Sequence, residues 1–365
     1  MTKPTIALSM LGLLLSFGTL AQEDLTPEEQ AYRDSITALN LENEAIANSQ
    51  TAYNKGIEEF QSKNYKAAIA EFKESIKFDP NFTAAYYNKG VAENELGSFA
   101  DAVKTLTQLI DKKSDYSKAF FQRGRAYQGL NDYLKAENDY QKSIDLDDSN
   151  PKAHYNFATL RFLQQDYDGA IAKFSKAIEL DDSNPNAYND RGSSYRMKGD
   201  YAKALSDYET AAKKNPNLAF VLNNIGTTKM KMDDFSGALA SFNRAISIDS
   251  KFHLAYNNRG VLQMKQKRMT EAIKDFQKAL EVKSDYSPAA ANLSGIYFQQ
   301  EEYQKALDAA EKAIQLDPEN AAAYVNRGNA REMMRDLDGA CQDWSKAKEL
   351  GSETGQTYYA GNCGN

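Results

Sequence analysis

The chain has 365 residues, of which 42% are apolar and only 8 are prolines, and its formal net charge is −7. This composition is typical of a folded and mostly helical protein. The negative charge disfavours binding to nucleic acid and binding to a membrane through a polybasic patch, because both require clustered Lys and Arg side chains.

The first 21 residues differ in composition from all that follow. Lys3 gives a short basic start, the run from Ile6 to Leu20 is mostly apolar, and small residues stand at Thr19 and Ala21. This pattern predicts a secretory signal peptide over 1–21, of the Gram-negative kind, cleaved before Gln22. The alternative is an uncleaved membrane anchor, although the run is short for a span. No Cys follows the run, so a lipid anchor is not expected. We therefore expect a periplasmic or secreted protein without a membrane span after cleavage.

Residues 22–48 form a predicted leader. Thr26, Pro27 and Glu29 supply an N-cap, a proline at the first helical position and an acid two residues further on. A helix from there to about Ile46 is predicted to cap whatever follows. The alternative is a leader that is partly disordered.

A repeat with a period of 34 residues begins at residue 49. Small residues recur at this spacing from Gly56 to Gly328, and an alanine follows each of them twelve residues later, from Ala68 to Ala340. Large residues recur three before and four after those alanines. These spacings place the side chains of each second half on one helix face. Nine repeats follow without insertion or deletion: 49–82, 83–116, 117–150, 151–184, 185–218, 219–252, 253–286, 287–320 and 321–354.

This pattern resembles the tetratricopeptide repeat (TPR) family over residues 49–354, and Ala187 to Gly192 with Tyr201, Ala204 and Pro216 are close to its consensus. The resemblance implies an all-α fold, a right-handed TPR superhelix (α-solenoid) of nine helix-turn-helix repeats. It also implies that the first helix of each repeat lines a concave groove and that the second forms the outer wall. Below, each repeat is numbered from position 1 to position 34, starting at residue 49.

Position 7, which is normally apolar in the family, carries a base in every odd repeat, and position 23 of the same repeats carries an acid. No even repeat has both. One interpretation is that the bases form a cationic stripe for an acidic ligand. The other is that each base forms a structural ion pair with the acid of its own hairpin. Because base and acid occur in the same repeats, and an unpaired charge between helices is unfavourable, the pattern favours the ion pairs. The predicted pairs are Lys55 with Glu71, Arg123 with Asp139, Arg191 with Asp207, Arg259 with Asp275 and Arg327 with Asp343.

Position 6, which points into the groove in this family, carries an amide in eight of the nine repeats. Its residues are Asn54, Asn88, Gln122, Asn156, Asp190, Asn224, Asn258, Asn292 and Asn326. A side-chain amide both donates and accepts, and can hold the backbone of an extended peptide without reading its sequence. The series resembles the asparagine ladder in the TPR region of O-linked glycosyltransferases. The alternative is that these amides bond only within the solenoid.

Position 5 is aromatic in the first four repeats, at Tyr53, Tyr87, Phe121 and Tyr155. Aromatic side chains on a groove surface are frequent anchors for a bound partner. Packing on the neighbouring helix is the alternative. These aromatics and the position-6 residues form the predicted peptide-binding groove.

Residues 355–365 are predicted to form a C-terminal cap, which solenoids need over their last apolar face. Gly351 ends the last repeat helix, Ser352 starts a short final one, and Tyr358 and Tyr359 are available to cover that face. The only two cysteines, Cys341 and Cys363, fall in this region, and in an exported chain they predict a disulfide. The alternative is two free thiols.

No catalytic constellation, phosphate-binding loop or metal site is recognisable, so neither enzymatic activity nor a cofactor is expected. The main hypothesis is a non-catalytic scaffold that binds an extended segment of a partner protein in its concave groove. One alternative is an accessory subunit of a cell-envelope complex that docks through the convex face or the ends. The others are a self-assembling (homo-oligomeric) or glycan-binding solenoid. The sequence does not name the partner.

Overall fold

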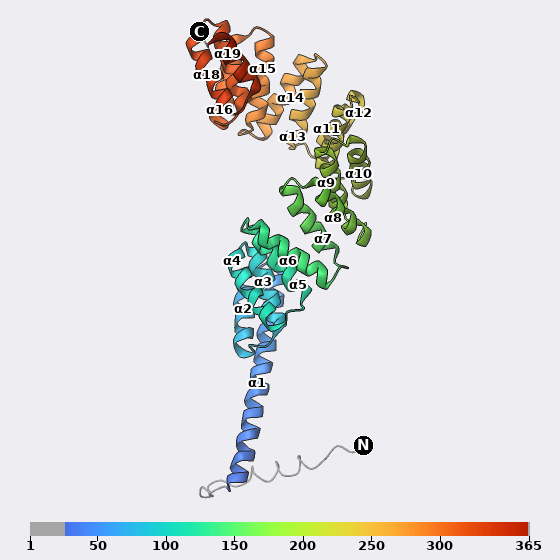
Figure 1. Ribbon diagram of the computed structural model, residues 1–365, viewed down its shortest axis with the longest axis vertical. Coiled ribbons are helices and arrows are strands. Elements are labelled where there is room, and N and C mark those ends of the chain that lie inside the picture. Colours follow the sequence, from blue (N-terminus) through green and yellow to red (C-terminus); the bar gives the residue numbers. More distant parts are fainter. Residues whose placement is uncertain (1–25, 364–365) are drawn as a thin grey trace. The chain divides into compact units, whose positions relative to one another are not determined.

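The computed structural model describes residues 26–363, which fold into 19 α-helices with no strand among them (Figure 1). The expected signal peptide at 1–21 lies outside the described residues. The all-α, helix-turn-helix fold expected from the 34-residue period is confirmed.

The chain divides into two compact units, 1–139 and 140–365. The described part of the first unit holds α1 (Pro27–Gln61), α2 (Tyr65–Phe78), α3 (Thr83–Leu96), α4 (Phe99–Lys112), α5 (Ser117–Gly129) and the start of α6 (Tyr133–Leu146), which crosses the boundary. The second unit continues with α7 (Pro151–Leu163), α8 (Tyr167–Leu180), α9 (Pro185–Met197), α10 (Tyr201–Lys214), α11 (Ala219–Lys231), α12 (Phe235–Ile248), α13 (His253–Lys265), α14 (Met269–Val282), α15 (Ser287–Gln299), α16 (Tyr303–Leu316), α17 (Ala321–Met333), α18 (Leu337–Glu349) and α19 (Glu353–Asn362).

Within each unit, consecutive helices pack as hairpins and the hairpins stack in chain order. The first helix of a repeat also contacts the first helix of the next repeat. Such contacts join α1 to α3, α3 to α5, α11 to α13 and α15 to α17. Over residues 26–363, second helices of neighbouring repeats make no comparable contact. Because the stack is tighter on the side of the first helices, these helices lie on the inner side of each unit's curve.

The hairpins close through the small residues that set the period. All nine alanines at position 20, from Ala68 to Ala340, are completely buried. At position 8 the fit is equally tight, because a Cβ added to Gly226 would lie 2.6 Å from the Phe242 ring, and one added to Gly56 would lie 2.6 Å from the Phe72 ring. The large residue at position 24 therefore occupies the space that glycine leaves in the facing helix.

The turn inside every hairpin contains a left-handed residue at position 15. Two of the nine are glycines, Gly97 and Gly199. The other seven carry side chains and have φ between 59° and 69°: Lys63, Asn131, Gln165, Asp233, Lys267, Glu301 and Arg335. The left-handed conformation is unfavourable for residues with a Cβ, so the backbone geometry is imposed here by the packing of the two helices.

The leader and the first repeat share one helix. The capping box of Thr26 and Glu29 starts α1 as expected, but α1 continues to Gln61 instead of ending near Ile46. No Pro or Gly interrupts the sequence between Pro27 and Lys55, so nothing breaks the helix at the predicted boundary. The first 20 or so residues of α1 extend beyond α2 and α3 and do not cover the first repeat (Figure 1).

A short helix, α19, follows the last repeat. Gly351 has a φ of 85° and follows α18 closely, and the Ser352 side chain accepts a hydrogen bond from the Gly355 backbone at the start of α19. In α19, the ring of Tyr358 lies 5.6 Å from that of Trp344, which is completely buried. The last apolar face of the stack is therefore covered by α19.

Candidate functional site

The position-6 side chains of the second unit are tied to the preceding repeat. Three of them donate a side-chain N–H to the side-chain oxygen of the asparagine at position 5 of the repeat before: Asn224 to Asn189 at 2.9 Å, Asn258 to Asn223 at 2.9 Å and Asn292 to Asn257 at 3.0 Å. We call these three pairs the asparagine ladder. Asn326 makes the equivalent bond to the backbone oxygen of Ala291 at 2.8 Å, because position 5 of that repeat has no polar side chain.

The two members of each ladder pair differ in burial. The position-5 acceptors Asn189, Asn223 and Asn257 are buried, at 7–8% exposure, whereas the position-6 donors are half-buried. Position 5 is thus the inner support and position 6 the surface group. Over residues 26–363, no hydrogen bond uses the Oδ1 atoms of Asn224 or Asn292. The ladder therefore presents two side-chain oxygens, those of Asn224 and Asn292, that are held in place and have no hydrogen-bond partner among the described residues.

The remaining position-6 residues are arranged differently. Asn54 is exposed and accepts a bond from Gln50, and Asn156 donates to the Lys152 backbone oxygen within its own helix. Gln122 is only 7% exposed, and its side chain accepts bonds from Asn94 and Arg125. Gln122 is therefore engaged inside the first unit, away from the surface where the sequence placed it.

The aromatic residues at position 5 of the first unit pack against other side chains of the stack. Tyr53 lies with its ring 4.8 Å from that of Phe82, and its hydroxyl accepts a bond from Asn88 at 2.7 Å. The ring of Tyr87 lies 5.5 Å from that of Tyr116. Phe121 is 7% exposed. Tyr53 therefore has the supporting place that asparagines hold in the ladder, and little of Phe121 is open to a partner.

Tyr155 and Asp190 form the same link with a carboxylate. The Tyr155 hydroxyl donates to Asp190 at 2.6 Å, and the Asn189 amide donates to its other oxygen at 2.9 Å. Burial raises the pKa of Asp190 above the usual range, against the effect of these two bonds. Burial and the nearby carboxylate also raise the pKa of Tyr155. Beside Asp190 is a hollow of about 170 Å³, lined by Thr159, Phe162, Phe174 and Ser193.

Four of the five predicted base–acid pairs are two-pronged hydrogen bonds between an arginine and an aspartate. The Nε and Nη2 atoms lie 2.6–2.9 Å from the two carboxylate oxygens in Arg123–Asp139, Arg191–Asp207, Arg259–Asp275 and Arg327–Asp343. The four aspartates are at most 6% exposed. The hydrogen bond to the aspartate raises the pKa of Arg191, Arg259 and Arg327. These guanidinium groups are neutralised, so they form no cationic stripe.

Each arginine also reaches the second helix of the preceding repeat. Arg191 donates through Nη1 to Ser175 at 3.1 Å, and Arg259 donates to Asn243 at 2.6 Å, in each case 16 residues before the arginine. The aspartate partner stands 16 residues after it. One guanidinium group thus contacts three helices. The base–acid pattern in the sequence did not predict the contact with the preceding repeat.

The first predicted pair differs from the other four. Lys55 is exposed, and over residues 26–363 no ion pair joins it to Glu71. The first repeat has no preceding second helix to bury position 7, and an ammonium group lacks the planar fork that grips a carboxylate at two points. The arginine arrangement therefore has no counterpart at the start of the stack.

The sixth repeat has a hollow where the odd repeats carry the arginine. At its position 7, Ile225 lines a hollow of about 520 Å³ formed by α10, α11 and α12. Lys213, Lys229 and Arg244 stand around it with Glu209. At this repeat, the surface formed with the second helices therefore differs from that of the odd repeats.

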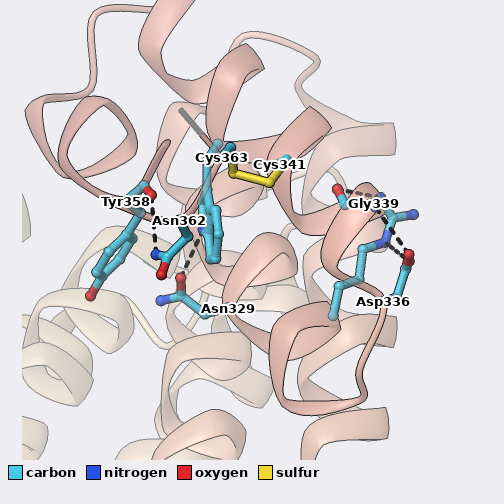
Figure 2. Close-up of a disulfide and its surroundings, with 9 residues drawn as sticks. Asn329, Asp336, Gly339, Cys341, Tyr358, Asn362 and Cys363 are labelled. Atoms are coloured by element: carbon cyan, nitrogen blue, oxygen red, sulfur yellow. Dashed lines mark hydrogen bonds and ion pairs between the residues drawn. A yellow bond between two sulfur atoms is a disulfide. The ribbon is translucent and has the colours of Figure 1, made fainter. Parts of the chain in front are cut away.

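The two cysteines are joined in a disulfide. Cys341 in α18 and Cys363 at the end of α19 have Cα atoms 5.7 Å apart (Figure 2). Three residues after Cys341 in α18, the indole of Trp344 donates to Asn329 of α17 at 2.9 Å. The disulfide therefore fastens the terminal helix, α19, to the last repeat.

Over residues 26–363, no cluster of three or more His, Cys, Asp or Glu side chains is grouped as metal ligands would be. No described helix combines the length and apolar character needed to cross a bilayer.

Family comparisons assign the repeats. Profiles described as tetratricopeptide repeat match residues 185–218 and 253–286, residues 117–150 and 221–252, and residues 84–113. A profile described as TPR repeat matches 56–93, 158–197 and 296–334. The chain belongs to the tetratricopeptide repeat family. TPR proteins are typically scaffolds for protein–protein interaction and generally not enzymes.

Solved structures show the same fold at low sequence identity. A tetratricopeptide repeat protein from Parabacteroides merdae matches with a TM-score of 0.57 and 18% identity, over 67% of this chain and 97% of that one. The APC/C hetero-tetramer Cut9-Hcn1 matches at 0.54 and 17%, over 73% of this chain and 52% of that one. Pseudomonas aeruginosa pilF matches at 0.51 and 20%, over 59% of this chain and 98% of that one.

These likenesses concern the fold alone. This chain spans about half the length of the Cut9-Hcn1 chain that it matches. The search of curated proteins found no match.

Proposed function

We propose that this TPR protein is a non-catalytic scaffold that binds an extended segment of a partner protein along the surface of its first helices. The observation that carries the proposal is the asparagine ladder. Its surface amides are each oriented by one hydrogen bond to a buried support, and the oxygens of Asn224 and Asn292 take no part in any bond of the described residues.

An amide held in this way suits the backbone of an extended chain. Its oxygen accepts a hydrogen bond from a peptide N–H, and its second N–H can donate to a peptide carbonyl. Because the support already fixes the side chain, little rotamer entropy is lost on binding. The ladder repeats once per TPR, so successive amides engage successive parts of the segment without selecting its side chains.

Side-chain selectivity is assigned to the hollow beside Asp190. Phe162 and Phe174 supply an apolar lining, and Thr159 and Ser193 give its polar rim. An apolar side chain of moderate size from the bound segment fits a hollow of about 170 Å³. Asp190 is the one carboxylate among the position-6 residues, so the ligand is expected to place a donor there.

The proposal includes export. A disulfide between Cys341 and Cys363 is typical of an oxidising compartment, and the pattern of residues 1–21 is that of a signal peptide. The N-terminus of the chain recovered from the periplasm or medium of a Gram-negative host is expected at Gln22. A recovered chain that keeps residues 1–21, or one found only in the cytoplasm, contradicts export.

A second candidate is an accessory subunit of a cell-envelope complex that docks through the second-helix surface. The hollow of about 520 Å³ formed by α10, α11 and α12 favours it, because apolar Ile225 and Leu222 are surrounded there by Lys213, Lys229 and Arg244. Such a mixture matches an acidic segment with an apolar anchor.

The test compares two variants that break the same two ladder bonds. In the surface variant, Asn258→Ala and Asn292→Ala are combined; in the support variant, Asn223→Ala and Asn257→Ala are combined. Each loses the bonds that join residue 258 to 223 and residue 292 to 257. Only the surface variant removes the half-buried amides, so any difference between the two reports on contact with the partner.

Both variants and the natural chain are expressed with an affinity tag, crosslinked in the cell envelope and compared by quantitative mass spectrometry. The partner is expected to be captured by the natural chain and the support variant and lost from the surface variant. Equal capture by all three excludes the ladder as the binding surface. Equal loss from both variants means that the ladder acts through the geometry of the stack. If the Ile225→Asp variant loses the partner while the surface and support variants keep it, the result supports docking through the second helices.

A further inference from the structure

The first half of α1 has no packing partner in the described chain. Over residues 27–48 no side chain is buried, and the first buried residue of the helix is Ser49. An isolated helix of this length is marginal in water without a surface to pack on. A helix that extends about 30 Å (20 residues at 1.5 Å each) without tertiary contacts therefore requires another surface.

The apolar residues of this segment follow a heptad pattern. Tyr32, Ile36, Leu39 and Ile46, with Asn43 between the last two, are spaced by 4, 3, 4 and 3 residues. The four apolar side chains are 69%, 41%, 51% and 51% exposed. Alternating spacings of 3 and 4 define the a and d positions of a coiled coil. Ile36 and Asn43 occupy a, and Tyr32, Leu39 and Ile46 occupy d; we call these five residues the heptad stripe.

The polar member of the stripe points to a second copy of this chain as the occupant. An asparagine at a is complementary to itself, since each amide offers a donor and an acceptor to the other. A single asparagine at a also sets register and favours two strands, at some expense in stability. In a parallel pair in register, the two copies of Asn43 meet in the same layer.

The flanking charges agree with the same arrangement. In the heptad that places Ile36 at a, Glu28 stands at g and Arg33 at e. Parallel coiled coils bring g of one helix beside the following e of the other, so Glu28 of one copy meets Arg33 of the second. The next two such contacts, Ser35 with Asn40 and Glu42 with Ala47, contain no like charges.

We propose that the protein forms a parallel homodimer through a short coiled coil of residues 32–46, with the heptad stripe as its seam. This surface is separate from the asparagine ladder. A test that contradicts the dimer therefore leaves the proposed binding at the ladder unaffected, and the reverse also holds. The seam has few layers, and the dimer dissociates on dilution.

The test measures the mass of the full chain, as the cell exports it, by sedimentation velocity over a wide range of protein concentration. The natural chain is expected to reach twice the monomer mass as concentration rises. Leu39→Glu places a charge in the seam and is expected to stay monomeric throughout. Leu41→Glu is the matched control, because Leu41 is 62% exposed but lies off the stripe, and this variant is expected to dimerise like the natural chain.

Direction is tested by single cysteines, since both natural cysteines are already paired. Asn43→Cys is expected to give a covalent dimer under mild oxidation, and Leu41→Cys is not. Thermal unfolding of the repeats serves as the folding control, because residues 27–48 do not pack on them. A natural chain that is monomeric at every concentration, or equal behaviour of Leu39→Glu and Leu41→Glu, overturns the dimer. Dimerisation without crosslinking at residue 43 overturns the parallel arrangement.

Discussion

Asn258 donates its side-chain N–H to the side-chain oxygen of Asn223, one repeat earlier, across 2.9 Å. The same bond recurs between Asn292 and Asn257 and between Asn224 and Asn189. This relationship explains why asparagine, a mediocre helix former, occupies two adjacent positions in the middle repeats. Position 5 supplies the acceptor for the next repeat, and position 6 supplies the donor to the previous one.

The first prediction concerns this bond. Asn258→Ala is expected to lower the free energy of unfolding by about 1 kcal/mol, since it removes one hydrogen bond and leaves a buried oxygen without its donor. Asn223→Ala is expected to lower it by a similar amount. Urea denaturation of both single variants and the double variant gives a double-mutant cycle. A double variant that loses the full sum of the two single effects would show that the residues are not coupled.

The second prediction concerns the arginine that joins three helices. Arg259→Leu leaves the buried carboxylate of Asp275 without its partner, and the free energy of unfolding is expected to fall by about 3 kcal/mol. Adding Asp275→Leu to the same chain is expected to restore most of that loss, because no charge then remains buried. Lys278→Ala, at the exposed pair with Glu281, is the control and is expected to leave stability unchanged.

Much of the fold followed from spacing. The 34-residue period predicted the hairpins. The matched base and acid at positions 7 and 23 predicted the four Arg–Asp contacts, but also the pair of Lys55 with Glu71, which does not form. Burial was harder to predict, because the sequence places a residue on a helix face but does not say how closely the next repeat covers that face. Gln122 and Phe121 belong to the predicted groove series by position, yet both are buried in the first unit.

Two further features carried too little local signal. Lys267, Glu301 and Arg335 have no preference for a left-handed conformation, so the turn at position 15 is visible only where glycine marks it. The continuous α1 differs from the predicted leader of residues 22–48, whose helix is expected to end near Ile46. Thr26 indicates where a helix starts, but no residue near Ile46 would stop it, so the sequence gives no local signal for an end there.

The third prediction tests the strain at position 15. Lys267 is exposed and has a φ of 60°. Lys267→Gly is expected to raise the free energy of unfolding by about 0.5–1 kcal/mol, because relief of the left-handed penalty exceeds the entropy that glycine adds to the unfolded chain. Gly199→Ala, at a φ of 81°, is the reverse change and is expected to destabilise by about 1 kcal/mol. Denaturant midpoints of the two variants should therefore move in opposite directions from that of the natural chain.

The fourth prediction is a pH dependence at Asp190. Burial raises its pKa in the folded state above the ordinary 3.8, so the folded chain holds this proton more tightly than the unfolded chain. The stability that the group contributes is complete below pH 3.8 and is lost as the pH rises through the raised pKa. Asp190→Asn keeps an oxygen acceptor for Tyr155 without the charge. The variant is expected to be more stable than the natural chain at neutral pH, and the two should converge in acid. A difference that stays constant between pH 4 and 8 contradicts the raised pKa.

The fifth prediction concerns the terminal disulfide. It closes a loop between residues 341 and 363, and on the chain-entropy model reduction is expected to lower the stability of that end by about 3 kcal/mol. Trp344 is the only tryptophan of the chain and lies beneath Tyr358 of α19, so its fluorescence reports on this region alone. Reductant is expected to move the fluorescence transition to lower urea while circular dichroism, dominated by the other helices, moves less. Cys363→Ser should behave like the reduced chain and should not respond to reductant. If its fluorescence transition coincides with that of the oxidised natural chain, packing around Trp344 holds α19 in place and the disulfide adds little.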